Sequence, residues 1–302
     1  MKKIKANSDK NATRELVNQI PLWIKREAKL PLPALRNLAQ LWLFVFPGKK
    51  HEKDRMVLLL IAAWIIITDR FFESRKTSRT QLLIFCRDID YCLKKPGHRQ
   101  DDKKTLGKSM DFSIRLFAEI FQILSEQKAD QRFLDQWKRS VRNFLKGMMN
   151  ERNFSYAHPP LLRQYLENGR QSIGSNAVLY AVALLIFRKP RWLGSEKFGI
   201  INKIIKDSAL LLRLINDLGS HKRESAHKIL NGLAVLIKQG ETAESSRKKI
   251  SRLIDKKLAI LKRRIKSAPL EFRPFFAALD KLLRFTLNLY ETKDYHNESP
   301  RP

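Results

Sequence analysis

The sequence has few cysteines and few glycines. Only Cys86 and Cys92 occur among 302 residues, too few for a disulfide framework or a cysteine-based zinc site, so a reducing compartment is favoured. There are 11 glycines, and no zinc-finger, RRM or G-x-x-G signature is found. The common nucleic-acid-binding modules are therefore not indicated.

Long apolar runs are also missing. The longest run, residues 57–68, stops at Asp69 and is shorter than the roughly 20 residues that span a bilayer. The N-terminus is polar and lysine-rich, without the apolar stretch of a secretory signal. We expect a cytoplasmic protein with no transmembrane segment, in which residues 57–68 form a buried helix.

Acidic residues are scarce relative to basic ones. The chain has 30 Asp and Glu against 60 Lys and Arg, a formal net charge of +30. Such an excess favours an anionic partner: nucleic acid, a membrane surface or phosphate. The charge is spread along the chain and is densest over residues 247–266, where apolar residues recur at helical spacing. We interpret this stretch as an amphipathic helix with a solvated basic face.

Helical periodicity runs through almost the whole sequence, without β-alternation. The hydrophobic fraction of 43% is typical of a globular protein, and no composition shift marks a second domain. We expect one all-α domain over residues 1–302, with flexible ends at 1–15 and about 292–302. The expected helices are 34–46, 53–74, 78–94, 103–126, 129–151, 159–187, 198–219 continuing to about 239, 244–267 and 271–290.

The most informative string is Asn-Asp-Leu-Gly-Ser-His-Lys-Arg-Glu at residues 216–224. Asn216, Ser220 and Glu224 are spaced i, i+4 and i+8, so on a helix they share one face over two turns. Amide, hydroxyl and carboxylate oxygens suit a hard divalent ion such as Mg2+ better than zinc. The alternative is a helix end, with Gly219 as a C-cap and Ser220 as the N-cap of a following helix.

A second acidic pair ends the apolar run of residues 57–68. Asp69 and Glu73 are spaced i, i+4, so both carboxylates share one face at the end of an apolar helix. They could bridge metal ions at the mouth of an apolar pocket. The alternative is a polar helix end, with Glu73 in a surface pair with Lys76 or Thr77.

A third element contains two glycines within a long helical pattern. Gly169 and Gly174 flank Arg170 and Ile173, and glycine costs roughly 1 kcal/mol in a helix interior. A helix break or a close backbone approach is therefore expected here. Arg170 beside such a break could bind an oxyanion bidentately. The alternative is an ordinary surface arginine.

Together these strings resemble the bacterial class I terpene synthases over roughly residues 40–295. Residues 216–224 are similar to the second metal motif of that family at every defining position. Arg170 lies 46 positions before Asn216, the spacing that the family keeps for its diphosphate-sensing arginine. Ile173 and Gly174 correspond to its linker and effector residues, and Asp69 lies where the family has its aspartate-rich motif.

Two positions depart from the family pattern. Arg70 stands where the aspartate-rich motif has an adjacent acid. The C-terminal Arg-Tyr pair keeps Tyr295 but has Asp294 in place of the arginine, and Lys293 is the candidate substitute. Arg223 matches in charge the lysine that the family has before the glutamate of its second motif.

The resemblance implies a helical bundle of the class I terpenoid synthase type around a central apolar cavity. It also implies three Mg2+ ions, with Mn2+ as an alternative, and a diphosphate bound between the metals and arginines. Aromatic side chains that could line the cavity include Trp64 and Tyr165, because ring faces attract cations; core packing is the alternative for each of them. The metal ligands would be Asp69, Glu73, Asn216, Ser220 and Glu224, the catalytic residues Arg170, Gly174 and Tyr295, and the substrate-binding residues Arg170, Arg223, Ile173, Gly174, Lys293, Trp64, Phe71 and Phe72.

The implied activity is that of a carbon–oxygen lyase acting on diphosphates. The enzyme would ionise an allylic isoprenyl diphosphate (farnesyl, geranylgeranyl or a precyclised C20 diphosphate) and cyclise the carbocation to a terpene hydrocarbon or alcohol. No nucleic-acid partner is expected, and a homodimer is compatible with the sequence.

Three alternatives stay open. A prenyltransferase would need two aspartate-rich motifs, and the nearest second candidate, residues 88–90, lacks the spacing. A non-catalytic basic helical protein binding nucleic acid or anionic membrane would explain the charge. A terpene synthase homologue without activity would explain Arg70 and Asp294.

Overall fold

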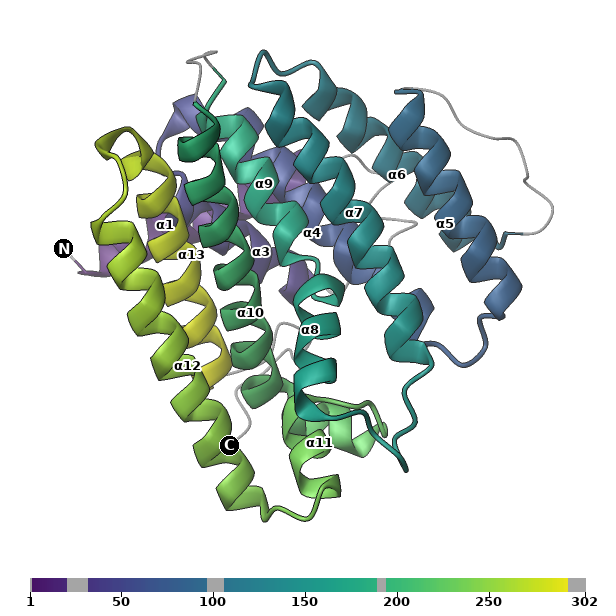
Figure 1. Cartoon of the computed structure of the whole chain (residues 1–302). Coiled ribbons are helices and arrows are strands. Elements are labelled where there is room, and N and C mark those ends of the chain that lie inside the picture. The colour runs from purple at the N-terminus through teal and green to yellow at the C-terminus, as the bar shows by residue number, and fades with distance from the viewer. Residues whose placement is uncertain (1, 21–31, 97–105, 189–193, 293–302) are drawn as a thin grey trace. The chain divides into compact units, whose positions relative to one another are not determined.

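The computed structural model describes residues 2–20, 32–96, 106–188 and 194–292 (Figure 1). Every regular element in these ranges is a helix, which confirms the predicted all-α class. Contacts between Cα atoms divide the chain into two compact units, a first unit of residues 1–128 with 295–302 and a second unit of residues 129–294. The single domain expected from the sequence stays a prediction.

The first unit is organised around a buried central helix, α4. Its elements are α1 (Lys2–Gln19), α3 (Leu32–Val45), η1 (Lys49–His51), α4 (Glu52–Glu73), α5 (Arg79–Lys94) and α6 (Lys108–Ser125). α4 packs against α3 and α6, and α5 packs against α6. The apolar run of residues 57–68 lies within α4 and most of its side chains are buried, as predicted.

The second unit is organised around its longest helix, α10. Its elements are α7 (Gln131–Arg152), α8 (Leu162–Ser172), α9 (Ser175–Ile186), α10 (Ser195–Ala226), α11 (Gly232–Lys238), α12 (Ala243–Lys266), η2 (Leu270–Phe272) and α13 (Arg273–Thr292). α10 packs against α8, α9, α11, α12 and α13, and α7 packs against α8 and α9. In Figure 1, α10 lies between α12 and the α8–α9 pair. Side chains of α10 can therefore contact most helices of this unit.

Several helix boundaries differ from the predicted ones; α6, for example, begins at Lys108 rather than at 103. α1 lies over Lys2–Gln19, where no helix was expected. The helical pattern of residues 159–187 is divided at Gly174, where a break was expected, and the φ of 72° of this glycine lies in the left-handed region. The predicted continuation from 219 to about 239 is also divided: α10 ends at Ala226, and Asn231 begins α11 by accepting a hydrogen bond from the backbone N–H of Ala234.

The basic stretch of residues 247–266 forms an amphipathic helix, as predicted. It lies within α12, whose residues Ile250, Ile254 and Leu261 are buried, while Arg247 and Lys262 are exposed. None of the helices in the described ranges has the length and apolar character needed to cross a bilayer.

Candidate active site

The three residues of the predicted metal motif lie on one face of α10. This helix continues without interruption through Gly219 and Ser220, so the alternative of a helix end at this point is wrong. The Ser220 hydroxyl donates to the backbone oxygen of Asn216 over 2.7 Å, and the Asn216 amide lies 3.5 Å from the Ser220 Oγ. Two of the proposed ligands are thus in direct contact along the helix.

Glu224, the third residue of this motif, is a buried carboxylate. Its Oε2 accepts a hydrogen bond from Nδ2 of Asn231 over 3.0 Å, and its Oε1 lies 3.4 Å from a guanidinium nitrogen of Arg223. Burial raises the pKa of Glu224, whereas Arg213, Arg223 and the hydrogen bond from Asn231 lower it. A divalent cation would offset the cost of this desolvated charge.

The chemistry of this face fits a hard divalent ion. The Ser220 hydroxyl gives its single proton to the helix backbone, so its lone pairs remain available as acceptors. The Asn216 amide has to turn over to present its oxygen. No cluster of three or more His, Cys, Asp or Glu side chains suitable for a metal occurs in the described part of the chain. This outcome is expected, because the α10 motif contains only one carboxylate.

The predicted helix break is present between α8 and α9. Ile173 follows α8, and Gly174 takes the left-handed conformation before α9 begins at Ser175. The Gly174 carbonyl accepts hydrogen bonds from the backbone N–H groups of Ala177 and Val178 at 3.0 and 3.4 Å, so it is part of the first turn of α9. The roles of Ile173 and Gly174 towards a substrate stay predictions.

Arg170 lies in the last turn of α8, directly before this break. Its backbone oxygen accepts a hydrogen bond from Nδ2 of Asn176 over 3.0 Å. Its half-buried side chain makes no hydrogen bond or ion pair with any described residue. The guanidinium group is therefore available to an anion.

The acidic pair of the first unit lies at the end of α4. Asp69 is half-buried and Glu73 is exposed, and both belong to the same continuous helix. Arg70 stands between them: burial lowers its pKa, and the two acids raise it. A cationic side chain thus interacts with the carboxylates that were predicted to bind metal.

Of the predicted cavity-lining aromatics of α4, Trp64 and Phe72 are buried in the core of the first unit and Phe71 is half-buried. The rings of Trp64 and Phe117 lie 4.8 Å apart, and Phe71 and Phe72 lie 5.8 and 6.4 Å from Phe85. Their contact with a substrate stays a prediction. Lys293 and Tyr295, predicted to close the site, lie outside the described residues.

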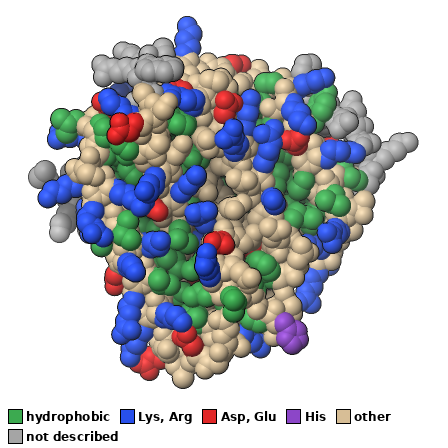
Figure 2. All heavy atoms as spheres, in the orientation of Figure 1, with side chains coloured by type: hydrophobic (Ala, Val, Ile, Leu, Met, Phe, Trp, Pro, Cys, Tyr) green, Lys and Arg blue, Asp and Glu red, His purple; other side chains and the backbone are tan. Residues whose placement is uncertain are grey.

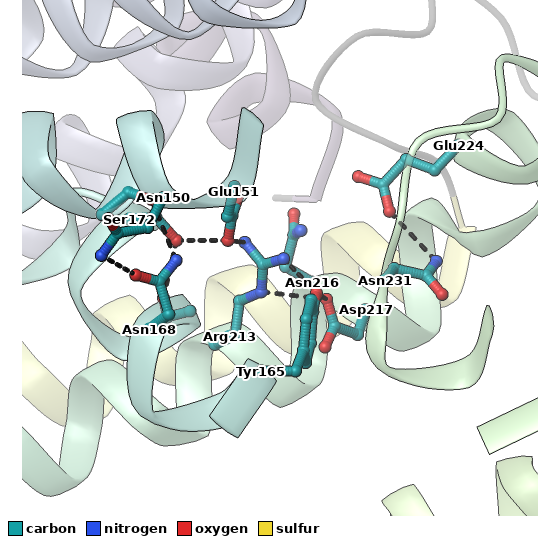
Figure 3. Close-up of polar contacts among 12 residues, drawn as sticks. Asn150, Glu151, Tyr165, Asn168, Ser172, Arg213, Asn216, Asp217, Glu224 and Asn231 are labelled. Carbon is teal, nitrogen blue, oxygen red and sulfur yellow. Dashed lines mark hydrogen bonds and ion pairs between the residues drawn. The ribbon is translucent and has the colours of Figure 1, made fainter. Parts of the chain in front are cut away.

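A cluster of buried polar residues lies beside the metal motif and was not predicted from the sequence, where Tyr165 was named only as a residue that could line the cavity (Figure 3). Tyr165 from α8 and Arg213 and Asp217 from α10 are almost fully buried and contact one another. Arg213 also forms an ion pair with Glu151 of α7. The available signal was an arginine and an aspartate spaced i, i+4 within the apolar part of α10.

A family model matches the part of the chain that contains most of these residues. The family model described as "Terpene synthase family 2, C-terminal metal binding" matches residues 61–259, which include the α4 acids, Arg170 and the whole α10 motif. No curated protein matches the sequence.

Solved structures similar to this chain include the following three. The SVS_A2 protein from ancestral sequence reconstruction has 16% identity and a TM-score of 0.69 over 97% of this chain and 88% of its own. Isoprene synthase from grey poplar leaves has 15% identity and a TM-score of 0.72 over 94% of this chain and 54% of its own. A variant of cucumene synthase has 11% identity and a TM-score of 0.70 over 94% and 95%. At these identities the likeness concerns the fold alone.

Proposed function

Because this chain belongs to the terpene synthase family, whose model is described as metal binding, we propose that it ionises an allylic isoprenyl diphosphate and cyclises the carbocation. Its fold is the all-α fold of the class I terpene synthases. The observation that carries the proposal is the α10 face, where an amide, a hydroxyl and a buried carboxylate follow one another at four-residue intervals.

Residues of the second unit have two proposed roles, metal binding and diphosphate binding. Asn216, Ser220 and Glu224 would hold one Mg2+ or Mn2+ ion. Bound metal supplies positive charge that stabilises the diphosphate as it leaves. Arg170 and Arg223 donate charge-assisted hydrogen bonds to diphosphate oxygens, which strengthen as negative charge develops on the leaving group.

Acidic and aromatic residues of the first unit also have proposed roles. Asp69, assisted by Glu73, would hold two further ions, and Arg70 weakens their attraction for metal. Trp64, Phe71 and Phe72 would exclude water and face the carbocation, because water would quench the cation and aromatic faces attract it.

The remaining assignments follow from the resemblance. Ile173 and Gly174 would contact the substrate at the α8–α9 break. Lys293 and Tyr295, beyond the described residues, would complete the diphosphate site in place of the family's Arg-Tyr pair.

A product assay tests the proposal. The purified full chain is incubated separately with geranyl, farnesyl and geranylgeranyl diphosphate and Mg2+, without isopentenyl diphosphate, and extracts are examined by gas chromatography–mass spectrometry. We expect a cyclic hydrocarbon or alcohol from at least one substrate, and none when EDTA replaces Mg2+. Elongated products that need isopentenyl diphosphate would instead identify a prenyltransferase, and no product from any substrate would contradict the proposal.

A further inference from the structure

Four polar side chains from three helices meet inside the second unit. Tyr165 of α8 and Asp217 of α10 are fully buried, Arg213 of α10 is 8% exposed, and Glu151 of α7 lies at the edge of the cluster. Burying charged groups is costly unless they are paired and hydrogen-bonded. We call these four residues the α10 network.

The members of the α10 network form ion pairs and hydrogen bonds with one another (Figure 3). The Arg213 guanidinium forms ion pairs with Glu151 Oε1 at 3.3 Å and with Asp217 Oδ1 at 3.1 Å. The Tyr165 hydroxyl donates to Asp217 Oδ1 over 2.9 Å and accepts a hydrogen bond from Arg213. The guanidinium also lies over the Tyr165 ring, 4.8 Å from its centre. Each link joins α10 to α7 or α8, or braces α10 itself.

Two glycines make room for this network. A Cβ atom at Gly169, the neighbour of Arg170, would lie 3.0 Å from Nε of Arg213. A Cβ atom at Gly232, the first residue of α11, would lie 2.7 Å from Oδ2 of Asp217. Contacts this close leave no space for a larger residue without rearrangement. α8 and α11 therefore both pack directly against the charged groups of α10.

The α10 network and the metal motif share one helix face. Arg213, Asp217, Ser220 and Glu224 follow at intervals of four, three and four residues, which is the spacing of one helical face. The network also reaches the helix break, since Ser172 at the end of α8 donates to Glu151 Oε1 over 2.5 Å. One connected set of polar contacts thus joins the metal-binding turns of α10 to the end of α8.

We propose that the α10 network is a positioning device, which holds the metal-binding face of α10 at a fixed rotation relative to α8 and its Arg170. The inference rests on the proposed function, because it assumes that the α10 motif binds metal. None of the four network residues needs to touch the diphosphate. They would act by orienting Asn216 and by placing the metal and the arginine for the same anion.

The test compares two tyrosine variants that each lose one buried hydroxyl. Tyr165→Phe removes the hydrogen bonds to Asp217 and Arg213 but leaves their direct ion pair and the ring packing. Tyr180→Phe is the matched control: Tyr180 of α9 is buried, and its hydroxyl donates to Asn202 of α10 over 3.1 Å, away from the metal motif. Both variants remove a hydroxyl that links a neighbouring helix to α10.

Metal binding is measured apart from catalysis, by the loss of the free Mn2+ electron paramagnetic resonance signal in the presence of inorganic pyrophosphate. Partners that orient metal ligands typically change affinity or activity by about 10-fold to 100-fold. We expect Tyr165→Phe to weaken Mn2+ binding by roughly 10-fold or more and to raise the Mg2+ concentration needed for half-maximal turnover similarly. Tyr180→Phe should stay within about twofold of the native protein in both measurements.

The outcomes separate the inference from the function beneath it. If the native protein neither binds Mn2+ with pyrophosphate nor forms product, the proposed function fails. If the native protein does both and the two variants behave alike, the positioning role is overturned while the function stands. Thermal unfolding of both variants, followed by circular dichroism, measures the general cost of losing the hydroxyl, and equal stability losses with unequal Mn2+ affinities would support positioning.

Discussion

Burial and charge oppose each other at Asp217. Burial raises the pKa of its carboxyl to about 7, while Arg213 lowers it and Glu224 raises it. The same group in an unfolded chain has a pKa of about 3.9. Between these values the folded protein retains a proton that the unfolded chain has released. The free energy of unfolding therefore falls as pH rises from about 4 to about 7.

Asp217→Asn should remove this part of the pH dependence. Urea unfolding of the metal-free protein is measured near pH 5 and near pH 7.5. We expect the variant to lose less stability between the two pH values than the native protein, because its amide has no proton to release in the folded state. Asp255→Asn, at an exposed site on α12, is the control and should keep the native slope. Identical slopes for all three proteins would contradict the assignment.

For single residues, the sequence predicts which side chains share a helix face better than it predicts contacts between residues far apart in the chain. Asn216, Ser220 and Glu224 could be predicted as one face because four-residue spacing fixes that face in any helix. The partners of Tyr165 could not, since Arg213 and Asp217 are 48 and 52 residues away in the chain. Such contacts depend on how α8 packs against α10, which helical periodicity does not specify.

At the scale of helices, α7 and α8 approach each other closely at Gly147. A Cβ atom at Gly147 would lie 2.8 Å from the backbone nitrogen of Ser172. This contact involves main chain rather than a flexible side chain, so the two helices would have to separate. Asn168 of α8 also donates to the Gly147 carbonyl over 2.9 Å, which depends on the same approach.

Gly147→Ala should therefore destabilise the protein. Overpacking typically costs about 1–3 kcal/mol, and the gain of roughly 1 kcal/mol in helix propensity only partly offsets it. Chemical denaturation provides the free energy of unfolding. Gly199→Ala is the matched control, because Gly199 lies within α10 and has nothing within 4 Å of an added Cβ. It should stabilise the protein by up to about 1 kcal/mol, and equal effects of the two substitutions would refute the close approach.

Helix existence was more predictable than helix ends. The pattern of apolar residues correctly predicted α4 and α10, because both present long apolar stretches to their neighbours. It placed the end of α10 too late, because a further apolar stretch, residues 233–237, follows Ala226 closely. The capping hydrogen bond of Asn231 starts a new helix there, and this feature is set by a single side chain.

At the scale of the whole molecule, the excess of positive charge is the most unusual property. Lys and Arg side chains are distributed over the face shown in Figure 2. Much of this charge is not locally neutralised: on α12, the side chains of Arg247, Arg252, Lys256 and Lys262 form no ion pair with any described residue. A net charge of +30 attracts an anionic diphosphate over distances limited by salt screening.

Turnover should therefore depend on ionic strength through substrate capture. Raising KCl from about 50 to about 300 mM shortens the screening length from about 14 to about 6 Å. We expect kcat/KM for the isoprenyl diphosphate to fall several-fold, with kcat much less affected, at saturating Mg2+. A kcat/KM that is constant across this range would show that the net charge does not assist substrate binding.

The most direct measurement of the central claim is pyrophosphate release by Glu224→Gln at saturating Mg2+ and substrate. This change removes the only carboxylate of the α10 motif while keeping its shape and its contact with Asn231 possible. The account predicts a rate at least about 100-fold below native, an undiminished melting temperature because a buried charge is lost, and a native rate for the exposed control Glu244→Gln. A folded Glu224→Gln protein that releases pyrophosphate at the native rate would contradict it.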